Sequence, residues 1–116
     1  MPTQFVEKQI TKLELAELAK ERFGDLIKAV VDVTRGVMVI GGELHADEEA
    51  ALLDQGSRQQ DLWGINLYPG SATNEFIEFD SVINIRPSQN NRSRDVLDPE
   101  VRQKIKEIVH QLVGEE

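Results

Sequence analysis

The run from Asn84 to Arg94 holds the densest set of side chains that could bind or transform a ligand. It contains Arg86, Arg92 and Arg94 and no acid. An Arg guanidinium meets a carboxylate or a phosphate through two parallel hydrogen bonds, while Asn and Ser add donors and favour turns. The run therefore predicts a loop that binds an anionic or polar small molecule; the alternative is a solvated loop whose arginines pair with acids elsewhere. The other side chains of this run that can form hydrogen bonds are Asn84, Ser88, Gln89, Asn90, Asn91 and Ser93, with Asp95 beside them. Of these, Asn84, Ser88, Gln89 and Asn90 are expected to contact the ligand.

Glu43, His45 and Asp47 form a second candidate set, directly after two glycines. If a strand continues through them, their spacing of two places all three on one face. Two carboxylates and an imidazole can bind a divalent metal or transfer protons. We expect no metal, because a second His and a known metal motif are lacking. Glu43 and His45 remain as the acid and base of any reaction; the alternative is that Asp47 caps a helix and the other two are solvated.

A third set lies on two expected strands. If the strands over residues 62–68 and 75–86 pair as a hairpin, Asn66, Tyr68, Asn84 and Arg86 lie beside one another on one face of the sheet. Half-buried Asn side chains must find hydrogen-bond partners. This cluster is either the floor of a binding site or a structural network that holds loops in place.

Several kinds of chemistry are excluded by what the sequence lacks. The chain has no Cys, which excludes disulfides, thiolate metal sites and a Cys nucleophile. Neither of the two standard glycine-rich nucleotide motifs occurs, and neither does the G-x-S-x-G motif of serine hydrolases. We therefore expect no cofactor.

Three helices are expected to position these residues. Thr11 and Glu14 form a capping box that starts a helix over residues 12–22. Residues 47–55 are helical in composition, with Asp47 as the N-cap. Asp98 followed by Pro99 starts a third helix over residues 99–113. The first and third have apolar residues at helical spacing and are expected to be amphipathic.

Four strands are expected from apolar residues at a spacing of two. They span residues 26–34, 37–43, 62–68 and 75–86, the last as one long strand bent near residue 80. A hairpin turn with Gly36 in the left-handed conformation joins the first two. The predicted fold is α+β: a two-layer single domain over residues 1–116, with a mostly antiparallel four-stranded sheet. The terminal helices cover one face, the opposite face or the rim of the sheet stays polar, and the middle helix is short.

The 116 residues carry 21 acids and 13 bases, a net charge of −8, which disfavours a general nucleic-acid binder. The charge is uneven, since residues 43–61 hold six acids and one base. No apolar run is long enough for a membrane span, and no secretory signal is evident, so we expect a cytoplasmic protein without membrane contact. Open sheet edges offer a second hypothesis, an interaction module that pairs with itself or with a basic partner through helix 47–55. Local RNA contact through the arginine loop is a weaker third.

Five segments resemble a small prokaryotic family described only as a domain of unknown function. They are 20–25, 41–49 (GGELHADEE), 63–69 (WGINLYP), 83–89 (INIRPSQ) and 91–94 (NRSR). The resemblance covers nearly the whole chain. It implies a single-domain soluble protein and brings no assigned activity with it.

Overall fold

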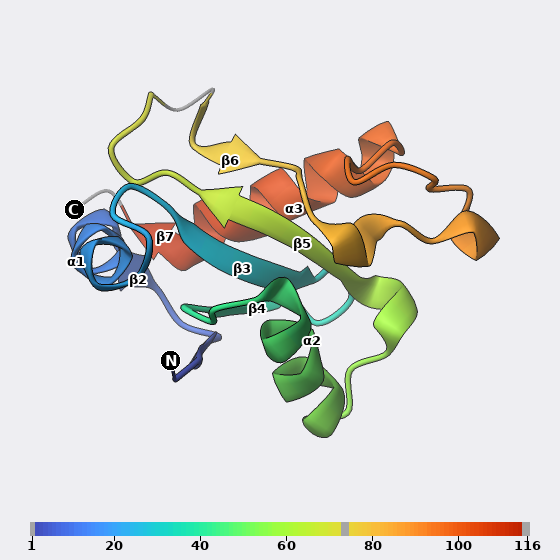
Figure 1. Ribbon diagram of the computed structural model, residues 1–116, viewed down its shortest axis with the longest axis horizontal. Helices are drawn as coiled ribbons and strands as arrows, with labels where there is room; N and C mark the ends of the chain where they lie inside the picture. Colours follow the sequence, from blue (N-terminus) through green and yellow to red (C-terminus); the bar gives the residue numbers. More distant parts are fainter. Residues whose placement is uncertain (1, 73–74, 115–116) are drawn as a thin grey trace.

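Five strands form one sheet, which a computed structural model describes together with the rest of residues 2–72 and 75–114 (Figure 1). They lie in the order β1-β4-β3-β5-β6, and each neighbouring pair is antiparallel. β2 and β7 form a separate parallel pair. The expected α+β class is confirmed, and β1 adds one strand at the sheet edge. The strands are β1 Gln4–Val6, β2 Ile10–Thr11, β3 Ile27–Asp32, β4 Val37–Ile40, β5 Leu62–Leu67, β6 Ile77–Glu78 and β7 Val113–Gly114.

The first and last helices start where the sequence predicts. α1 (Lys12–Arg22) begins with the expected capping box, in which Thr11 Oγ1 accepts the Glu14 N–H and Glu14 Oε1 accepts the Thr11 N–H, both at 3.0 Å. α3 (Pro99–Leu112) follows Asp98, whose carboxylate accepts the Glu100 N–H at 2.9 Å. Such caps satisfy backbone donors that have no partner within the helix. No helix in the described ranges is long and apolar enough to cross a membrane.

The main core lies between one sheet face and these two helices. α1 contributes Leu15 and Ala19, and α3 contributes Ile105 and Val109, all buried. In Figure 1, α3 lies behind the sheet and α1 lies at its left end. Full burial of one aliphatic side chain stabilises the fold by about 1.5–3 kcal/mol, so this face accounts for most of the apolar stabilisation. The sheet residues of this core include Ile27, Ala29, Val31, Met38, Ile40, Ile65 and Leu67.

The opposite sheet face, one of the two places expected to stay polar, is partly apolar because α2 (His45–Asp54) packs on part of it. Leu52 of α2 joins a second buried cluster with Val30 and Leu62. This contact explains why Val30, which shares a strand face with the polar residues Lys28 and Asp32, is apolar and buried. The predicted N-cap, Asp47, was wrong. The helix begins two residues earlier, after Leu44, and Leu44 has no side-chain cap; tertiary hydrogen bonds of its first turn hold it there instead.

The predicted long strand over residues 75–86 was also wrong. β6 covers only Ile77–Glu78, and the chain then forms two 3-10 helices, η3 (Val82–Asn84) and η4 (Pro87–Gln89). The prediction rested on apolar residues at every second position, but this pattern does not match the burial. Ile85, expected to face the core, is 43% exposed, whereas Phe76, expected on the other face, is buried. Hydrogen bonds from Ser81 and Asn84 replace the strand ladder in this segment.

Candidate functional site

Arg86, the first arginine of the expected anion loop, has other partners. Its guanidinium stacks on the ring of Trp63, 4.1 Å from the ring centre. Its two terminal nitrogens donate to the carbonyl oxygens of Gln59 and Leu62, which precede and begin β5. Arg86 Nε is buried without a partner among the described residues. These contacts make Arg86 a tie between the loop and the start of β5.

Asn84 and Asn91 hold the backbone of the same loop. Asn84 is fully buried, and its amide nitrogen donates to the carbonyls of Gly64 and Arg94, each at 2.9 Å. The amide nitrogen of Asn91 donates to the carbonyls of Asn84 and Asp95, each at 2.7 Å. Both side chains satisfy buried backbone groups, which favours the structural interpretation of the Asn-rich run.

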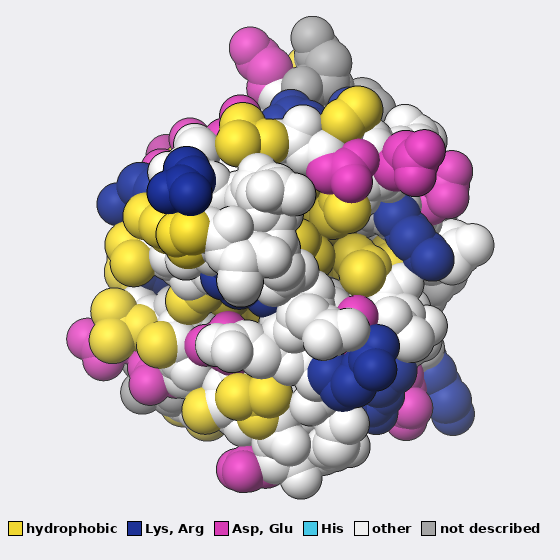
Figure 2. Space-filling view, turned by 90° about the vertical axis from the view of Figure 1, so that its right-hand side faces the viewer, with side chains coloured by type: hydrophobic (Ala, Val, Ile, Leu, Met, Phe, Trp, Pro, Cys, Tyr) yellow, Lys and Arg dark blue, Asp and Glu magenta, His cyan; other side chains and the backbone are white. Residues whose placement is uncertain are grey.

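The remaining loop residues are more open. Arg94 pairs with Asp80 at 2.6 Å, and Gln89 donates to the Gln60 carbonyl at 3.0 Å. Asn90 adopts a left-handed conformation with φ 59°, and Ser88 and Arg92 are exposed. Figure 2 looks onto this end of the molecule, where separate Lys and Arg side chains lie among uncharged, hydrophobic and acidic surface. A cleft of about 380 Å³ opens beside the loop and is lined by Trp63, Gln89, Asn90, Asn91, Leu97, Asp98 and Val101. A second cleft, of about 390 Å³, lies between α1 and the end of β5.

A polar row crosses three strands on the sheet face that α2 shares. Lys28 of β3 is in register with Asn66 of β5, which is in register with Glu78 of β6. Residues directly opposite in antiparallel strands lie side by side on one face. Asn66 Nδ2 donates to Glu78 Oε1 at 2.9 Å and to the Asp80 carbonyl at 3.3 Å, whereas Asn66 Oδ1 is buried without a partner among the described residues.

The first turn of α2 places two buried titratable side chains beside this row. His45 Nε2 lies 2.7 Å from the Ile65 carbonyl. Since a carbonyl only accepts, this nitrogen carries the proton, and Nδ1 holds the free lone pair of the neutral ring. Burial lowers the pKa of His45, and the nearby charge of Lys28 adds to the effect. His45 is therefore a neutral imidazole at pH 7.

Glu48, one turn further along α2, is fully buried. Glu48 Oε2 accepts the Gly42 N–H at 2.8 Å, and Oε1 has no partner among the described residues. Burial raises the pKa of Glu48 to about 9, so the carboxyl is protonated at neutral pH. Sequence reasoning treated Glu48 as a surface acid. Gly42 was the available signal, because a Cβ there would stand 2.8 Å from Glu48 Cγ.

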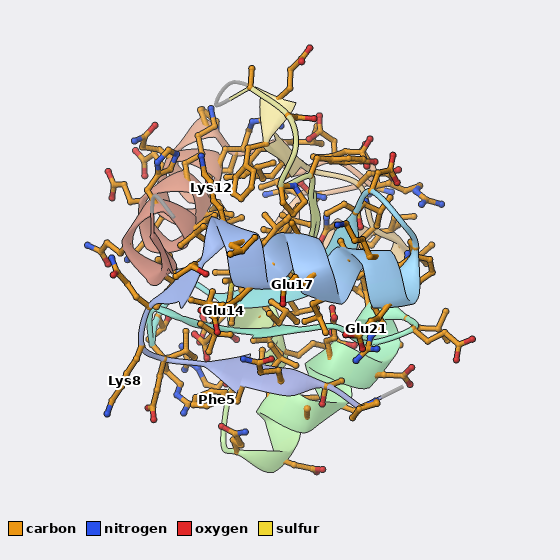
Figure 3. All side chains as sticks on the ribbon, turned by 90° about the vertical axis from the view of Figure 1, so that its left-hand side faces the viewer. Phe5, Lys8, Lys12, Glu14, Glu17 and Glu21 are labelled. Atoms are coloured by element: carbon orange, nitrogen blue, oxygen red, sulfur yellow. The ribbon has the colours of Figure 1, made fainter. Side chains whose placement is uncertain are left out.

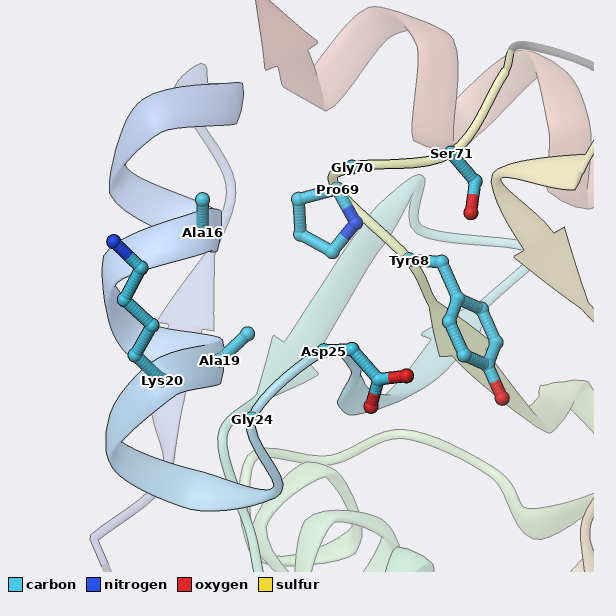
Figure 4. Close-up of a pocket in the computed structure, with 9 residues that line it drawn as sticks. All are labelled: Ala16, Ala19, Lys20, Gly24, Asp25, Tyr68, Pro69, Gly70 and Ser71. Atoms are coloured by element: carbon cyan, nitrogen blue, oxygen red, sulfur yellow. The ribbon is translucent and has the colours of Figure 1, made fainter.

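Tyr68 connects this region with the cleft of about 390 Å³ between α1 and the end of β5. Its hydroxyl donates to Glu78 Oε1 at 3.1 Å. Figure 4 shows the hydroxyl pointing away from α1, while Ala16, Ala19 and Pro69 form apolar walls and the Asp25 carboxylate points toward the ring. Burial and the bond to Glu78 raise the pKa of Tyr68, so the phenol remains a donor.

The structure thus brings together three of the expected residues, His45, Asn66 and Tyr68. We call the set Lys28, His45, Glu48, Asn66, Tyr68 and Glu78 the polar band. Lys28, Glu48 and Glu78 were not anticipated. Asn84 and Arg86 contact β5 nearer its start, at Gly64 and Leu62 respectively. Glu43 is exposed on the loop before α2. Within residues 2–72 and 75–114, no three His, Cys, Asp or Glu side chains are grouped to hold a metal ion.

A family described as "Protein of unknown function (DUF5674)" matches residues 4–112. No curated protein and no solved structure matches the chain.

Proposed function

The chain belongs to the DUF5674 family, and we propose that it binds a small polar molecule on the polar band, over β5 between α2 and β6. The observation that carries the proposal is Asn66. Its amide nitrogen has two acceptors, but its Oδ1 is buried and lacks a donor among the described residues. His45 lies within hydrogen-bond reach of the Asn66 side chain, but the one N–H of its neutral ring is held by the Ile65 carbonyl. A buried acceptor without a partner costs about 1–3 kcal/mol, and a donor group of a ligand removes that cost.

The neighbouring side chains suit a ligand that both donates and accepts hydrogen bonds. His45 offers the lone pair of Nδ1, since Nε2–H is held by the Ile65 carbonyl. Lys28 supplies the positive charge of the band, and Tyr68 lines the adjoining cleft. If the bound molecule reacts, His45 is the general base, because a neutral imidazole accepts a proton at pH 7. Of the two residues expected to act as acid and base, His45 is retained and Glu43, which is exposed, is not.

We place the ligand at the polar band and not at the arginine loop because the guanidinium groups there already have partners. Arg86 is bound to two carbonyls and to Trp63, and Arg94 is paired with Asp80. Arg92 is left as the exposed arginine of the loop. An anionic ligand remains the alternative, with Arg92 as its principal contact.

The test is a titration of the ¹⁵N-labelled protein with acetamide, glycine, ethylene glycol and citrate, followed by backbone amide shifts. We expect at least one of the first three to shift amides of β5, β6 and the first turn of α2. Asn66→Leu should abolish these shifts, and Tyr68→Phe should weaken them. Arg92→Ala is the matched control and should leave them unchanged.

Two outcomes overturn the proposal. Shifts that persist in Asn66→Leu show that the Asn66 oxygen plays no part. Shifts from citrate alone, centred on residues 86–94 and lost in Arg92→Ala, assign binding to the loop. Tyr68→Phe removes one hydroxyl and keeps the ring, so it provides a folded variant if Asn66→Leu does not fold.

A further inference from the structure

β1 is an edge strand with one side unpaired. It pairs with β4 through Gln4, Phe5 and Val6, and within residues 2–72 and 75–114 no strand lies along its other side. The outward N–H and C=O groups of such a strand are a template for another extended chain. Peptide-binding domains use this kind of edge to add one strand to the sheet.

An acidic stripe on α1 lies beside this edge. Glu14, Glu17 and Glu21 are three and four residues apart, which places them on one side of the helix, and all three are exposed. Figure 3 shows them on the side of α1 that faces the viewer, between the helix axis and β1. A groove of about 330 Å³ is lined by residues 4–10, which carry one acid (Glu7) and one base (Lys8), and by Glu14 of α1.

The side chains of an added strand would reach this stripe. Val6 of β1 packs in the core shared with α1, whereas Phe5 packs in the cluster under α2. Alternate side chains of a neighbouring strand therefore point to the α1 side. Basic side chains at those positions would face the carboxylates of Glu17 and Glu21.

We propose that β1 binds a short, extended, basic segment of another protein as a sixth strand, with its Lys or Arg side chains against the acidic stripe of α1. The proposal is independent of the polar band, which lies toward the other edge of the sheet, so either can fail alone. The expected basic-partner surface on residues 47–55 is a separate prediction; one of its acids, Glu48, is fully buried.

Charge favours a basic partner over a second copy of this chain. Pairing two β1 edges would bring two acidic stripes close to each other, and each chain carries a net charge of −8. Like charges across a strand pair are destabilising. A basic segment reverses the sign of this interaction.

The test is a fluorescence anisotropy titration of the full chain with a labelled eight-residue peptide of alternating Lys and Val. We expect saturable binding that weakens as salt is added, and no binding of the matched Glu–Val peptide. Glu17→Lys should weaken binding about 3- to 10-fold, the effect of reversing one exposed charge. Glu107→Lys, which reverses an exposed helical acid on α3, should leave it unchanged.

Backbone N-methylation distinguishes strand addition from simple charge attraction. A strand at an edge bonds through alternate residues, so methylation of one set of alternate nitrogens should abolish binding and methylation of the other set should be tolerated. Equal binding of both methylated peptides, or equal weakening by Glu17→Lys and Glu107→Lys, overturns the proposal. The proposal is also overturned if the peptide does not bind, or if light scattering shows that the chain itself forms a dimer that the peptide does not dissociate.

Discussion

The side-chain amide of Asn84 binds both backbone groups of Gly64. Asn84 Oδ1 accepts the Gly64 N–H at 2.8 Å, and Asn84 Nδ2 donates to the Gly64 carbonyl at 2.9 Å. The amide thereby takes the place of a neighbouring strand at this point of β5. Two hydrogen bonds to one residue fix both the position and the orientation of the turn that follows β6.

Asn84→Asp should destabilise the protein by roughly 2–4 kcal/mol, because it puts an acceptor against the carbonyls of Gly64 and Arg94 at a fully buried position. The measurement is the free energy of unfolding in urea. Asn90→Gly is the control, since Asn90 is exposed with φ 59° and glycine accepts that conformation. Equal stability of wild type and Asn84→Asp would contradict the described network.

Gly64→Ala should also destabilise the protein, by about 1–3 kcal/mol, through overpacking. A Cβ on Gly64 would stand 2.6 Å from both Cβ and Oγ of Ser81, so the turn at residues 81–84 must move. Gly70→Ala is the matched control because a Cβ there meets no atom within 4 Å. Thermal unfolding of both variants gives the comparison, and a smaller loss for Gly64→Ala than for Gly70→Ala would show that the turn does not pack here.

Glu48→Gln should change how stability depends on pH. The pKa of Glu48 is raised from its usual 4.5 to about 9, so the folded chain holds one more proton than the unfolded chain between these values. Stability from this group is therefore present at low pH and lost as pH rises. Relative to Glu48→Gln, the wild type should lose roughly 1–3 kcal/mol between pH 5 and pH 8.

Urea unfolding of both proteins across this pH range checks the prediction. Glu107→Gln, which changes an exposed helical carboxylate, is the control and should follow the wild type. A constant difference between wild type and Glu48→Gln at all pH values would mean that Glu48 is ionised in the folded protein.

Arg86→Ala should shift the emission of Trp63 to longer wavelength and destabilise the protein by about 1–3 kcal/mol. The guanidinium covers the ring at 4.1 Å and binds two carbonyls, and its loss exposes the ring and leaves the Leu62 carbonyl unpaired. Trp63 is the single Trp of the chain, so the Trp fluorescence comes from this ring. Arg92→Ala should change neither quantity, and an unchanged spectrum in Arg86→Ala would rule out the stacking.

His45 should titrate below pH 6.5, because burial lowers its pKa. The same burial makes the folded chain hold fewer protons than the unfolded chain just below that pH, so the stability contributed by this group is lost as the solution is acidified. Ring ¹⁵N shifts measured against pH give both the pKa and the tautomer. The Nδ1–H form at neutral pH would contradict the hydrogen bond to Ile65.

Local sequence signals determined where two helices start and where three strands lie. The capping box at Thr11 and the Asp98-Pro99 start depend on residues within one helical turn, so no distant contact is needed to find them. The segments that became β3, β4 and β5 are rich in β-branched or apolar residues over four to six positions. His45, Asn66 and Tyr68 were selected from their types and spacing alone.

The tertiary structure decided the rest, because contacts between distant segments outweighed local pattern. Residues 75–86 alternate like a strand, yet Gly64 leaves room for Ser81 to pack against β5 and for Asn84 to form hydrogen bonds with it, and the ladder ends at Glu78. In the sequence, Glu48 has the pattern of a surface acid. In the structure, α2 packs on the second sheet face, so Glu48 is buried and its carboxyl is protonated at neutral pH. Side chains of the arginine loop found backbone carbonyls and Trp63 as partners, whereas the unmatched polar atom of Asn66 was left at the polar band. Sequence thus named the polar residues, and packing decided which of them hold the fold.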